Sequence, residues 1–379
     1  MSRNKTKVAI FLRGFHNGGI EKVFESYFSH MDLSRYEIHM VTHMKNDARR
    51  KRVFELMGCR IHELSKVHGH RLTFIYFKEY KELFSSNKFD IVHNNSPDNL
   101  LPLFFAVLKK VPCRILHAHS NYLLDINPTE KARLRLYRIG YSLHSSLANV
   151  LIGVSRDAAL STFGANKEHK TILLPNAIDE YRFSYNPNIR AEYRKKLKCE
   201  HSLVLGHVGR YENNFKNQKF ILELFKVVIE RNPNAKLLMI GDGVYRQDYE
   251  RLSRDYGIGD SVHFIGAVDN VEDYMQAMDI FVFPSLKEGL GIAAIEAQAT
   301  GLPCLVSDRV PREVEISDSV EFLSIDNGVR CWVDAIERNC NYIRESNESL
   351  VRSSGFSIFD QAVKLDQIYQ GVTSKSNNG

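Results

Sequence analysis

The chain has 379 residues, of which 44% are hydrophobic and 25% charged, and its formal net charge is +6. This composition is typical of a globular protein, and it excludes disordered, collagen-like and coiled-coil chains. The length is sufficient for two domains of ordinary size.

The sequence also bears on location. Its longest apolar stretch, Leu100–Leu108, is well below the ~20 residues that a membrane span needs, and it contains Pro102. The first apolar run, Val8–Leu12, is too short for a secretion signal. We therefore expect a cytoplasmic protein. The six cysteines are scattered and form no Cys-x-x-Cys pair, so the sequence predicts neither a disulfide framework nor a zinc site.

The charge is distributed unevenly along the chain. Residues 1–175 carry 27 Lys and Arg against 15 Asp and Glu, a net charge of +12, whereas residues 176–379 carry 24 against 30, a net charge of −6. A basic first half joined to an acidic second half indicates that only the first faces a polyanion, such as an anionic membrane, a nucleic acid or a phosphorylated acceptor. Basic positions on the helix-like segment Lys131–Leu147 are typical of a membrane-surface helix or of a solvated face.

In the first half, short apolar runs alternate with longer amphipathic stretches. The expected strands are Val8–Leu12, Glu37–Thr42, Arg60–Leu64, Asp90–His93, Arg114–Ala118, Val150–Val154 and Thr171–Leu174. The helix-like segments between them include Ile20–Met31, Leu72–Ser85 and Thr129–Leu147. This rhythm predicts an α/β fold, with a parallel sheet covered by helices on both faces.

The pattern restarts after a polar stretch. The strands expected in the second half are Leu203–Val208, Lys236–Ile240, Val262–Ile265, Ile280–Phe283 and Pro303–Val306. The sequence thus predicts an N-terminal domain at 1–178, a linker at 179–200 and a C-terminal domain at 201–355. Residues 356–379 should form a last helix, Ile358–Tyr369, which crosses back to the first domain, and a frayed polar tail. Ligands should bind beyond the carboxyl ends of the strands, in a cleft between the two sheets.

Two short motifs follow strands of the first half. Gly14–Gly19 contains Gly18 and Gly19 and opens the first helix, so it is either a tight turn or a place where the backbone approaches an anion. It matches neither a dinucleotide fingerprint nor a P-loop. His117 and His119 end another strand, with both side chains on one face; no third ligand type is nearby, so a metal is not expected.

The second half contains two motifs with charged residues. Gly209 and Arg210 follow a strand, and Lys216 with Asn217 precedes a helix, which suits a diphosphate. Glu288 and Glu296 lie eight residues apart around Leu290, Gly291 and Ile292. That separation would be ~12 Å along a helix, at 1.5 Å per residue, and it suits the two ends of a nucleotide sugar. The glycines would expose helix amides to the phosphates.

The Glu-x7-Glu pattern, followed by Ala297–Pro303, resembles the signature of retaining glycosyltransferases of family four, also called glycosyl transferases group 1. The resemblance covers nearly the whole chain. The other matching segments are Gly18–Glu21, Asp90–His93, His119, Gly153–Ser155, Pro175–Asp179, Gly209–Arg210, Lys216–Asn217 and Gly241–Gly243. It implies the GT-B fold, in which two Rossmann-like domains face each other across a cleft. Ala177 and Leu290 depart from the family's usual residues, and neither is a charged site residue.

The resemblance also implies residue roles. Arg210 and Lys216 would neutralise the diphosphate, and Glu296 would bind the ribose hydroxyls. Glu288 and the amides of Leu290, Gly291 and Ile292 would hold the sugar and the β-phosphate. His119 would contact the sugar near the reacting carbon, and Gly18 and Gly19 would approach the phosphates and the acceptor. The catalytic residues are then His119, Glu288, Arg210 and Lys216, with no metal and no cofactor.

The expected activity is transfer of a hexose or N-acetylhexosamine from a nucleotide sugar, most readily a UDP-sugar, to a lipid-linked saccharide in bacterial exopolysaccharide, capsule or O-antigen synthesis. The basic first domain would dock on the inner leaflet of the cell membrane as a peripheral protein, with residues 72–77 as an apolar contact or as core helix. Two alternatives remain: a non-hydrolysing sugar-nucleotide epimerase, and a basic protein that binds membranes or nucleic acid without catalysis. The second lacks the sequence modules of nucleic-acid binding.

Overall fold

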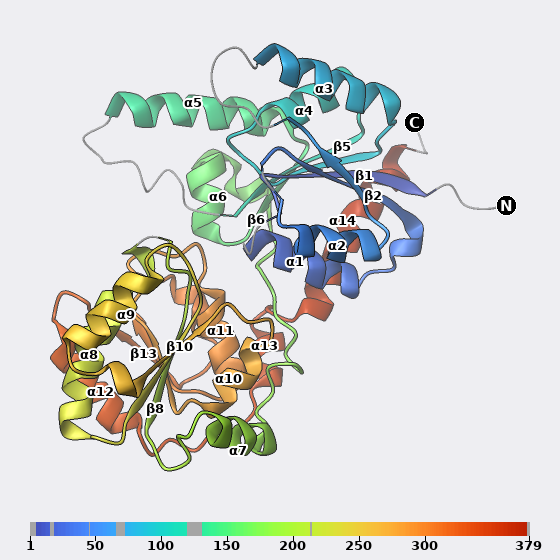
Figure 1. The fold of residues 1–379 in the computed structure, drawn as a ribbon. Coiled ribbons are helices and arrows are strands. Elements are labelled where there is room, and N and C mark those ends of the chain that lie inside the picture. The colour runs from blue at the N-terminus through green and yellow to red at the C-terminus, as the bar shows by residue number, and fades with distance from the viewer. Residues whose placement is uncertain are drawn as a thin grey trace. The chain divides into compact units, whose positions relative to one another are not determined.

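The computed structural model describes residues 5–15, 19–44, 46–65, 73–119, 131–212 and 214–376. These residues form two compact units. Unit 1 comprises residues 1–177 and 358–379, and unit 2 comprises residues 178–357 (Figure 1). Each unit contains one sheet in which every pairing between strands is parallel. The predicted α/β class is confirmed.

Unit 1 contains a seven-stranded sheet in the order β3-β2-β1-β4-β5-β6-β7. Its strands are β1 (Thr6–Leu12), β2 (Tyr36–Thr42), β3 (Arg60–Glu63), β4 (Ile91–Asn94), β5 (Cys113–Ala118), β6 (Val150–Gly153) and β7 (Thr171–Leu173). Its helices are α1 (Gly19–Ser29), α2 (Ala48–Leu56), α3 (Thr73–Ser86), α4 (Leu101–Leu108), α5 (Lys131–Leu147), α6 (Arg156–Phe163) and α14 (Ile358–Ser376). All seven strands predicted for this half are present.

Side chains that alternate along β1 show how both faces of this sheet are buried. Val8, Ile10 and Leu12 pack in one core with residues of α1 and α14. Ala9 and Phe11 pack in the other core with residues of α3, α4 and α6. Because neither face of the strand meets water, its sequence is a continuous apolar run rather than an alternating one.

Unit 2 contains a six-stranded sheet in the order β10-β9-β8-β11-β12-β13. Its strands are β8 (Val204–Val208), β9 (Lys236–Ile240), β10 (Val262–Gly266), β11 (Ile280–Phe283), β12 (Cys304–Ser307) and β13 (Val320–Leu323). Its helices are α7 (Pro187–Lys196), α8 (Gln218–Arg231), α9 (Arg246–Asp255), α10 (Val271–Ala277), α11 (Ile292–Ala299), α12 (Val329–Asn339) and α13 (Glu348–Ser353). The sequence did not predict β13, a half-buried four-residue strand at the edge of the sheet.

The predicted linker at 179–200 is wrong. Phe183, Tyr193 and Cys199 are buried in a core of unit 2, and α7 packs against α10. Tyr193 donates a hydrogen bond to Asp273 at 3.0 Å. Helix α7 is mostly polar, so its sequence does not indicate the few apolar residues that attach it to unit 2.

Helix α14 is part of unit 1. Ile358, Ala362, Leu365 and Tyr369 are fully buried there, and Tyr36 donates to the Asp366 carboxylate at 2.7 Å. The helix continues to Ser376, so the predicted frayed tail from 374 is wrong for its first three residues; 377–379 lie outside the described residues.

All six cysteines are free thiols, four of them buried. In the described part of the chain, no helix is long and apolar enough to cross a membrane.

We expect Gly206→Ala to lower the free energy of unfolding by about 1–3 kcal/mol, because overpacking a filled core forces side chains to move. A Cβ at Gly206 would lie 1.9 Å from the Met278 sulfur. Gly140→Ala is the control: nothing lies within 4 Å of its Cβ position, and alanine favours a helix. Urea unfolding that shows equal stability for the two variants would contradict this packing argument.

Candidate functional site

The strand order of each unit locates its candidate site. In both sheets the strand order reverses beside the first strand, between β1 and β4 in unit 1 and between β8 and β11 in unit 2. Open parallel sheets bind ligands at this switch point, outside the carboxyl ends of the strands. Ligand-binding residues are therefore expected directly after β8 and β11 in unit 2, and after β1, β4 and β5 in unit 1.

In unit 2, the predicted diphosphate residues and the first glutamate come together at this switch point. Gly209 and Arg210 directly follow β8, and Lys216 ends a short 3₁₀ turn, Asn214–Lys216. The Lys216 ammonium donates to the Glu288 carboxylate, which is only 10% exposed, and it also lies 5.1 Å from the centre of the Phe283 ring. The structure thus brings together Lys216 and Glu288, 72 residues apart in sequence.

The loops around this ion pair are fixed by backbone contacts. Leu286 N–H donates to the carbonyl of Phe215 at 2.7 Å, and Asn217, with a left-handed φ of 56°, donates from its amide to the carbonyl of Pro284. The side-chain amide of Gln218 donates a hydrogen bond to the carbonyl of Arg210 at 2.9 Å. The Arg210 guanidinium is 60% exposed and pairs only at the surface, with Glu212 at 3.0 Å. Such an exposed pair is weak, so Arg210 is available to turn towards an anion.

Gly241 allows the loop after β9 to lie directly against the loop after β8. Its φ is +134°, and a Cβ there would lie 1.9 Å from the carbonyl oxygen of Gly209. Only glycine fits this close approach of two backbones, which brings the loop after β9 against the loop that carries Arg210.

Helix α11 begins at Ile292, with Gly291 as its N-cap at a left-handed φ of 96° and no side-chain cap. Leu290 is buried. Amides without a side-chain cap at the start of a helix favour an anion, so the anion site expected here stays a prediction. The helical spacing predicted for the two glutamates does not apply, because Glu288 lies in the loop before the helix and only Glu296 is helical. Glu296 is half-buried within α11. Burial alone would lower the pKa of Arg182, but its hydrogen bond to Glu272 raises it, and the charge of Glu296 makes a smaller contribution in the same direction.

In unit 1, Gly18 lies outside the described residues, and Gly19 is the first residue of α1. Glu21 in the first turn of this helix is buried.

The predicted pair His117 and His119 belongs to a larger histidine cluster. Their rings lie 3.9 Å apart, which confirms the expected common face. His93 on β4 is 3.1 Å from His117, between Nε2 and Nδ1, and its own Nδ1 is 2.8 Å from the hydroxyl of Tyr369 on α14. His119 Nε2 is 2.8 Å from Oδ1 of Asn95.

Burial keeps these histidines neutral. It lowers the pKa of His93 and of His119 to about 3, and it holds the pKa of His117 well below its ordinary value. On β8 of unit 2, burial also lowers the pKa of His207 to about 4. Each imidazole is therefore a neutral hydrogen-bonding group at physiological pH.

Sequence reasoning missed the roles of Asn95 and Tyr369. Asn95 directly follows β4 and lies two residues after the end of the strand predicted at Asp90–His93, a position that could have identified it. Tyr369 is 276 residues from His93, and no sequence signal indicates that contact.

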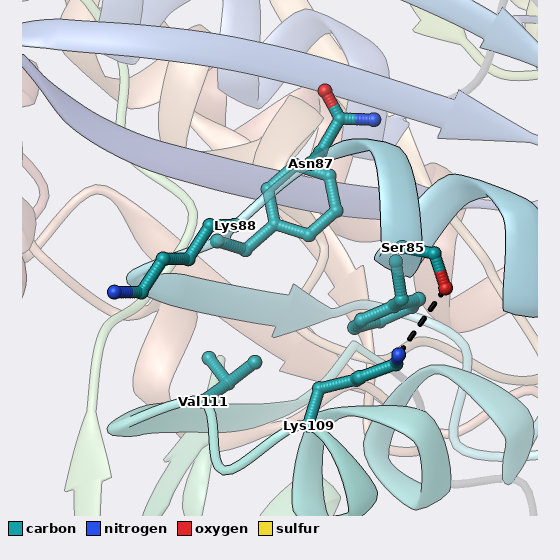
Figure 2. Close-up of a pocket in the computed structure, with 7 residues that line it drawn as sticks. Ser85, Asn87, Lys88, Lys109 and Val111 are labelled. Carbon is teal, nitrogen blue, oxygen red and sulfur yellow. Dashed lines mark hydrogen bonds between the residues drawn. The ribbon is translucent and has the colours of Figure 1, made fainter.

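Two surface cavities lie away from these residues. One, of about 260 Å³, is lined in part by Phe89 and Val111, which precede β4 and β5; Figure 2 shows Lys109 donating to Ser85 at its rim, over 3.2 Å. The other, of about 370 Å³, is lined by residues of α7 and by Glu200 in unit 2. The first lies at the amino ends of the strands, the edge opposite to the switch point, and is not the substrate site.

Comparison with known proteins identifies the family. A model described as "Glycosyl transferases group 1" matches residues 189–341, and one described as "Glycosyltransferase Family 4" matches residues 17–182. The chain belongs to glycosyltransferase family 4. Together the two models cover most of both units, and the family is a retaining one.

The chain is similar to other bacterial glycosyltransferases over most of its length. It is 28% identical over 392 residues to the "Putative glycosyltransferase EpsF" of Bacillus subtilis, with 100% of both chains covered. It is 25% identical to an Escherichia coli enzyme named "UDP-Gal:alpha-D-GlcNAc-diphosphoundecaprenol alpha-1,3-galactosyltransferase", over 76% of this chain and 77% of the other. Among solved structures, Anabaena HepE in complex with UDP matches with a TM-score of 0.72 at 15% identity, covering 99% of this chain and 100% of that one. This likeness shows the GT-B fold.

The neutral histidines predict a loss of stability in acid. An unfolded histidine binds a proton below about pH 6.5, whereas His93 and His119 remain neutral down to about pH 3. The unfolded state then binds more protons, so the free energy of unfolding falls as the pH falls below about 6.5. We expect His117→Gln to reduce the dependence of the free energy of unfolding on pH by about 1.4 kcal/mol per pH unit. Urea unfolding between pH 6 and pH 5 measures this dependence.

The control for this measurement is His169→Gln, which changes an exposed histidine of the same unit. An equal slope in wild type and His117→Gln would show that His117 is not held neutral by burial.

Proposed function

We propose that the protein is a retaining, metal-independent glycosyltransferase that moves a hexose or N-acetylhexosamine from a UDP-sugar to a lipid-linked saccharide, in the synthesis of a bacterial surface polysaccharide. The observation that carries the proposal is the convergence of Arg210, Lys216, Glu288 and the uncapped start of α11 at one switch point. The name of the Escherichia coli galactosyltransferase, which specifies a diphosphoundecaprenol-linked sugar, supports the acceptor class, and the HepE complex supports UDP.

The proposed chemistry is electrostatic. In the structure Lys216 is paired with Glu288. A bound diphosphate offers two negative charges to Lys216 and Arg210 and shares the ammonium with Glu288. These cations stabilise the charge that develops on the leaving diphosphate as the bond to the sugar breaks. Because the positive charges come from side chains and helix amides, the reaction as proposed needs no metal.

The remaining roles in this proposal are those that the resemblance to the family implies. Glu296 accepts hydrogen bonds from the ribose hydroxyls, while Glu288 and the amides of Leu290, Gly291 and Ile292 hold the sugar and the β-phosphate. His119 contacts the transferred sugar as a neutral imidazole. Gly18 and Gly19 approach the phosphates and the acceptor. The acceptor hydroxyl attacks from the side on which the diphosphate departs, which retains the configuration of the sugar.

We expect UDP at ~100 times its dissociation constant to stabilise the protein by about 2.7 kcal/mol. Arg210→Ala and Glu296→Ala should abolish this stabilisation, measured as a shift in thermal unfolding. Arg251→Ala is the matched control, because Arg251 is another exposed arginine of unit 2, at 67% side-chain exposure, paired with Asp248.

The nucleotide and the metal are tested in the same assay. A shift with GDP or ADP but not with UDP would overturn the proposed donor. A shift retained in both variants would place the nucleotide elsewhere. Turnover that is lost in EDTA and restored by magnesium would overturn the metal independence.

We also propose that unit 1 attaches peripherally to an anionic membrane at the cytoplasmic face, through the outer surface of α3, α4 and α5. These helices are neighbours in Figure 1. Their large exposed apolar side chains, 39–60% accessible, are Phe77, Phe104, Val107, Leu108, Ile139 and Leu143. The exposed basic residues beside them are Lys78, Lys81, Lys109, Lys110, Arg135 and Arg138.

This combination suits a membrane rather than a nucleic acid. Apolar side chains at i and i+4 on α5, Ile139 and Leu143, can enter the acyl boundary while Arg135 and Arg138 meet lipid phosphates. Nucleic-acid surfaces combine basic groups with hydrogen-bonding side chains instead of such an aliphatic stripe.

We expect the double substitution Ile139→Glu with Leu143→Glu to weaken binding to phosphatidylglycerol-containing vesicles by about tenfold or more, because it removes apolar burial and adds charge repulsion. The matched control is Ile343→Glu, in unit 2, where the isoleucine is 82% exposed. Sedimentation with vesicles at low and high salt measures the effect. Binding to RNA but not to vesicles would overturn the proposal.

A further inference from the structure

The amide of Asn95 has one allowed orientation. Asn95 is buried, and its Nδ2 faces two backbone carbonyls, those of Phe11 at 3.3 Å and His93 at 3.4 Å. Turning the amide over would place its oxygen against both carbonyl oxygens, an arrangement without a hydrogen bond. The amide nitrogen therefore donates to the carbonyls, and Oδ1 faces His119.

This orientation determines the tautomer of His119. Since Oδ1 of Asn95 only accepts, the ring nitrogen 2.8 Å away, Nε2, carries the proton and donates it. In a neutral imidazole the other nitrogen, Nδ1, is then a bare acceptor. Burial keeps the ring neutral, with a pKa of about 3.

The acceptor atom is buried and unused. Nδ1 of His119 has no hydrogen-bond partner among the described residues. Leaving a buried acceptor unsatisfied is unfavourable, so a ligand that brings an O–H or N–H group to this atom gains a hydrogen bond without having to break one.

The surroundings reinforce the neutral state. Among the described residues, the titratable groups packed around the ring are His117 on the same strand, His93 on β4 and, beyond them, Tyr369 of α14. Both neighbouring histidines are themselves held neutral by burial, and the pKa of Tyr369 is raised by burial. None of these groups stabilises a charged imidazolium.

We propose that Asn95 is a positioning residue that holds His119 as its Nε2–H tautomer and so presents the Nδ1 lone pair to a hydroxyl group of the substrate. The substrate in this statement, a nucleotide sugar, rests on the proposed function; the tautomer and its cause do not. Asn95 itself acts only through the ring of His119.

The tautomer is measured directly by nitrogen-15 NMR of the imidazoles, with the His119 signals assigned by their loss in His119→Gln. We expect one proton, on Nε2, throughout pH 6–8. Asn95→Ala should give a mixture of both tautomers. A proton on Nδ1 in the wild type, or an unchanged tautomer in Asn95→Ala, would overturn the proposal. These measurements need no substrate, so they remain decisive if the proposed transferase activity is not found.

A second variant covers a failure of Asn95→Ala to fold. Asn95→Asp keeps an acceptor oxygen beside Nε2 and adds a negative charge, which favours the imidazolium. It also replaces the amide donor that faces the carbonyls of Phe11 and His93 with a second oxygen, so we expect this variant to be less stable than the wild type. On protonation Nδ1 becomes a donor and no longer accepts. We expect kcat/KM for the UDP-sugar to be about tenfold lower at pH 6 than at pH 8 in this variant. In the wild type kcat/KM should not fall between pH 8 and pH 6 for this reason.

The matched control is Asn99→Asp, which places the same charge in the same loop. Asn99 accepts from Leu101 N–H at the start of α4 and donates to the Tyr80 hydroxyl, and an aspartate serves both contacts. A fall in kcat/KM at acid pH in Asn95→Asp alone, measured at a temperature where thermal unfolding shows both variants to be folded, supports the positioning role. An equal fall in activity at every pH would mean a structural role only and would overturn it.

Discussion

Parallel pairing of every strand is the constraint on which the rest of this protein depends. In each unit the first strand lies inside the sheet, the chain adds two strands on one side, and then it returns to add the others on the opposite side. All carboxyl ends consequently meet at one edge, and the reversal separates the loops on either side of it. Arg210, Lys216 and Glu288 meet in unit 2 for this reason, and Asn95 and His119 in unit 1.

At this edge of the sheet, unit 2 presents charged side chains, whereas unit 1 presents buried, neutral polar ones. In unit 2 the charged groups are exposed or paired with each other: Arg210 lies at the surface beside Glu212, and Lys216 contacts Glu288. An anion can take over these partners. In unit 1 the polar groups are buried and neutral, and each hydrogen bond fixes the orientation of the next ring. Burial removes the charge of the histidines but preserves their directionality, which suits recognition of hydroxyl groups rather than phosphates.

Much of the fold could be predicted because its determinants are local. Apolar runs marked twelve of the thirteen strands, and only β13, a short edge strand with half-buried residues, escaped. The predicted linker failed for the opposite reason. Helix α7 is polar, and what attaches it to unit 2 is a few buried residues, including Tyr193, together with hydrogen bonds to partners about 80 residues away. No local pattern records such distant contacts.

The sequence by itself determined the class of fold, the two sheets, and the charged residues that identify the family, because these depend on residue types at fixed short spacings. Only the tertiary structure decided which residues meet. It paired Lys216 with Glu288, it placed Glu288 in a loop rather than on the helix of Glu296, and it connected Tyr369 through His93 to the histidine pair. It also oriented the amide of Asn95, since that depends on two carbonyls from neighbouring strands. Burial and hydrogen-bond direction arise only once distant segments pack.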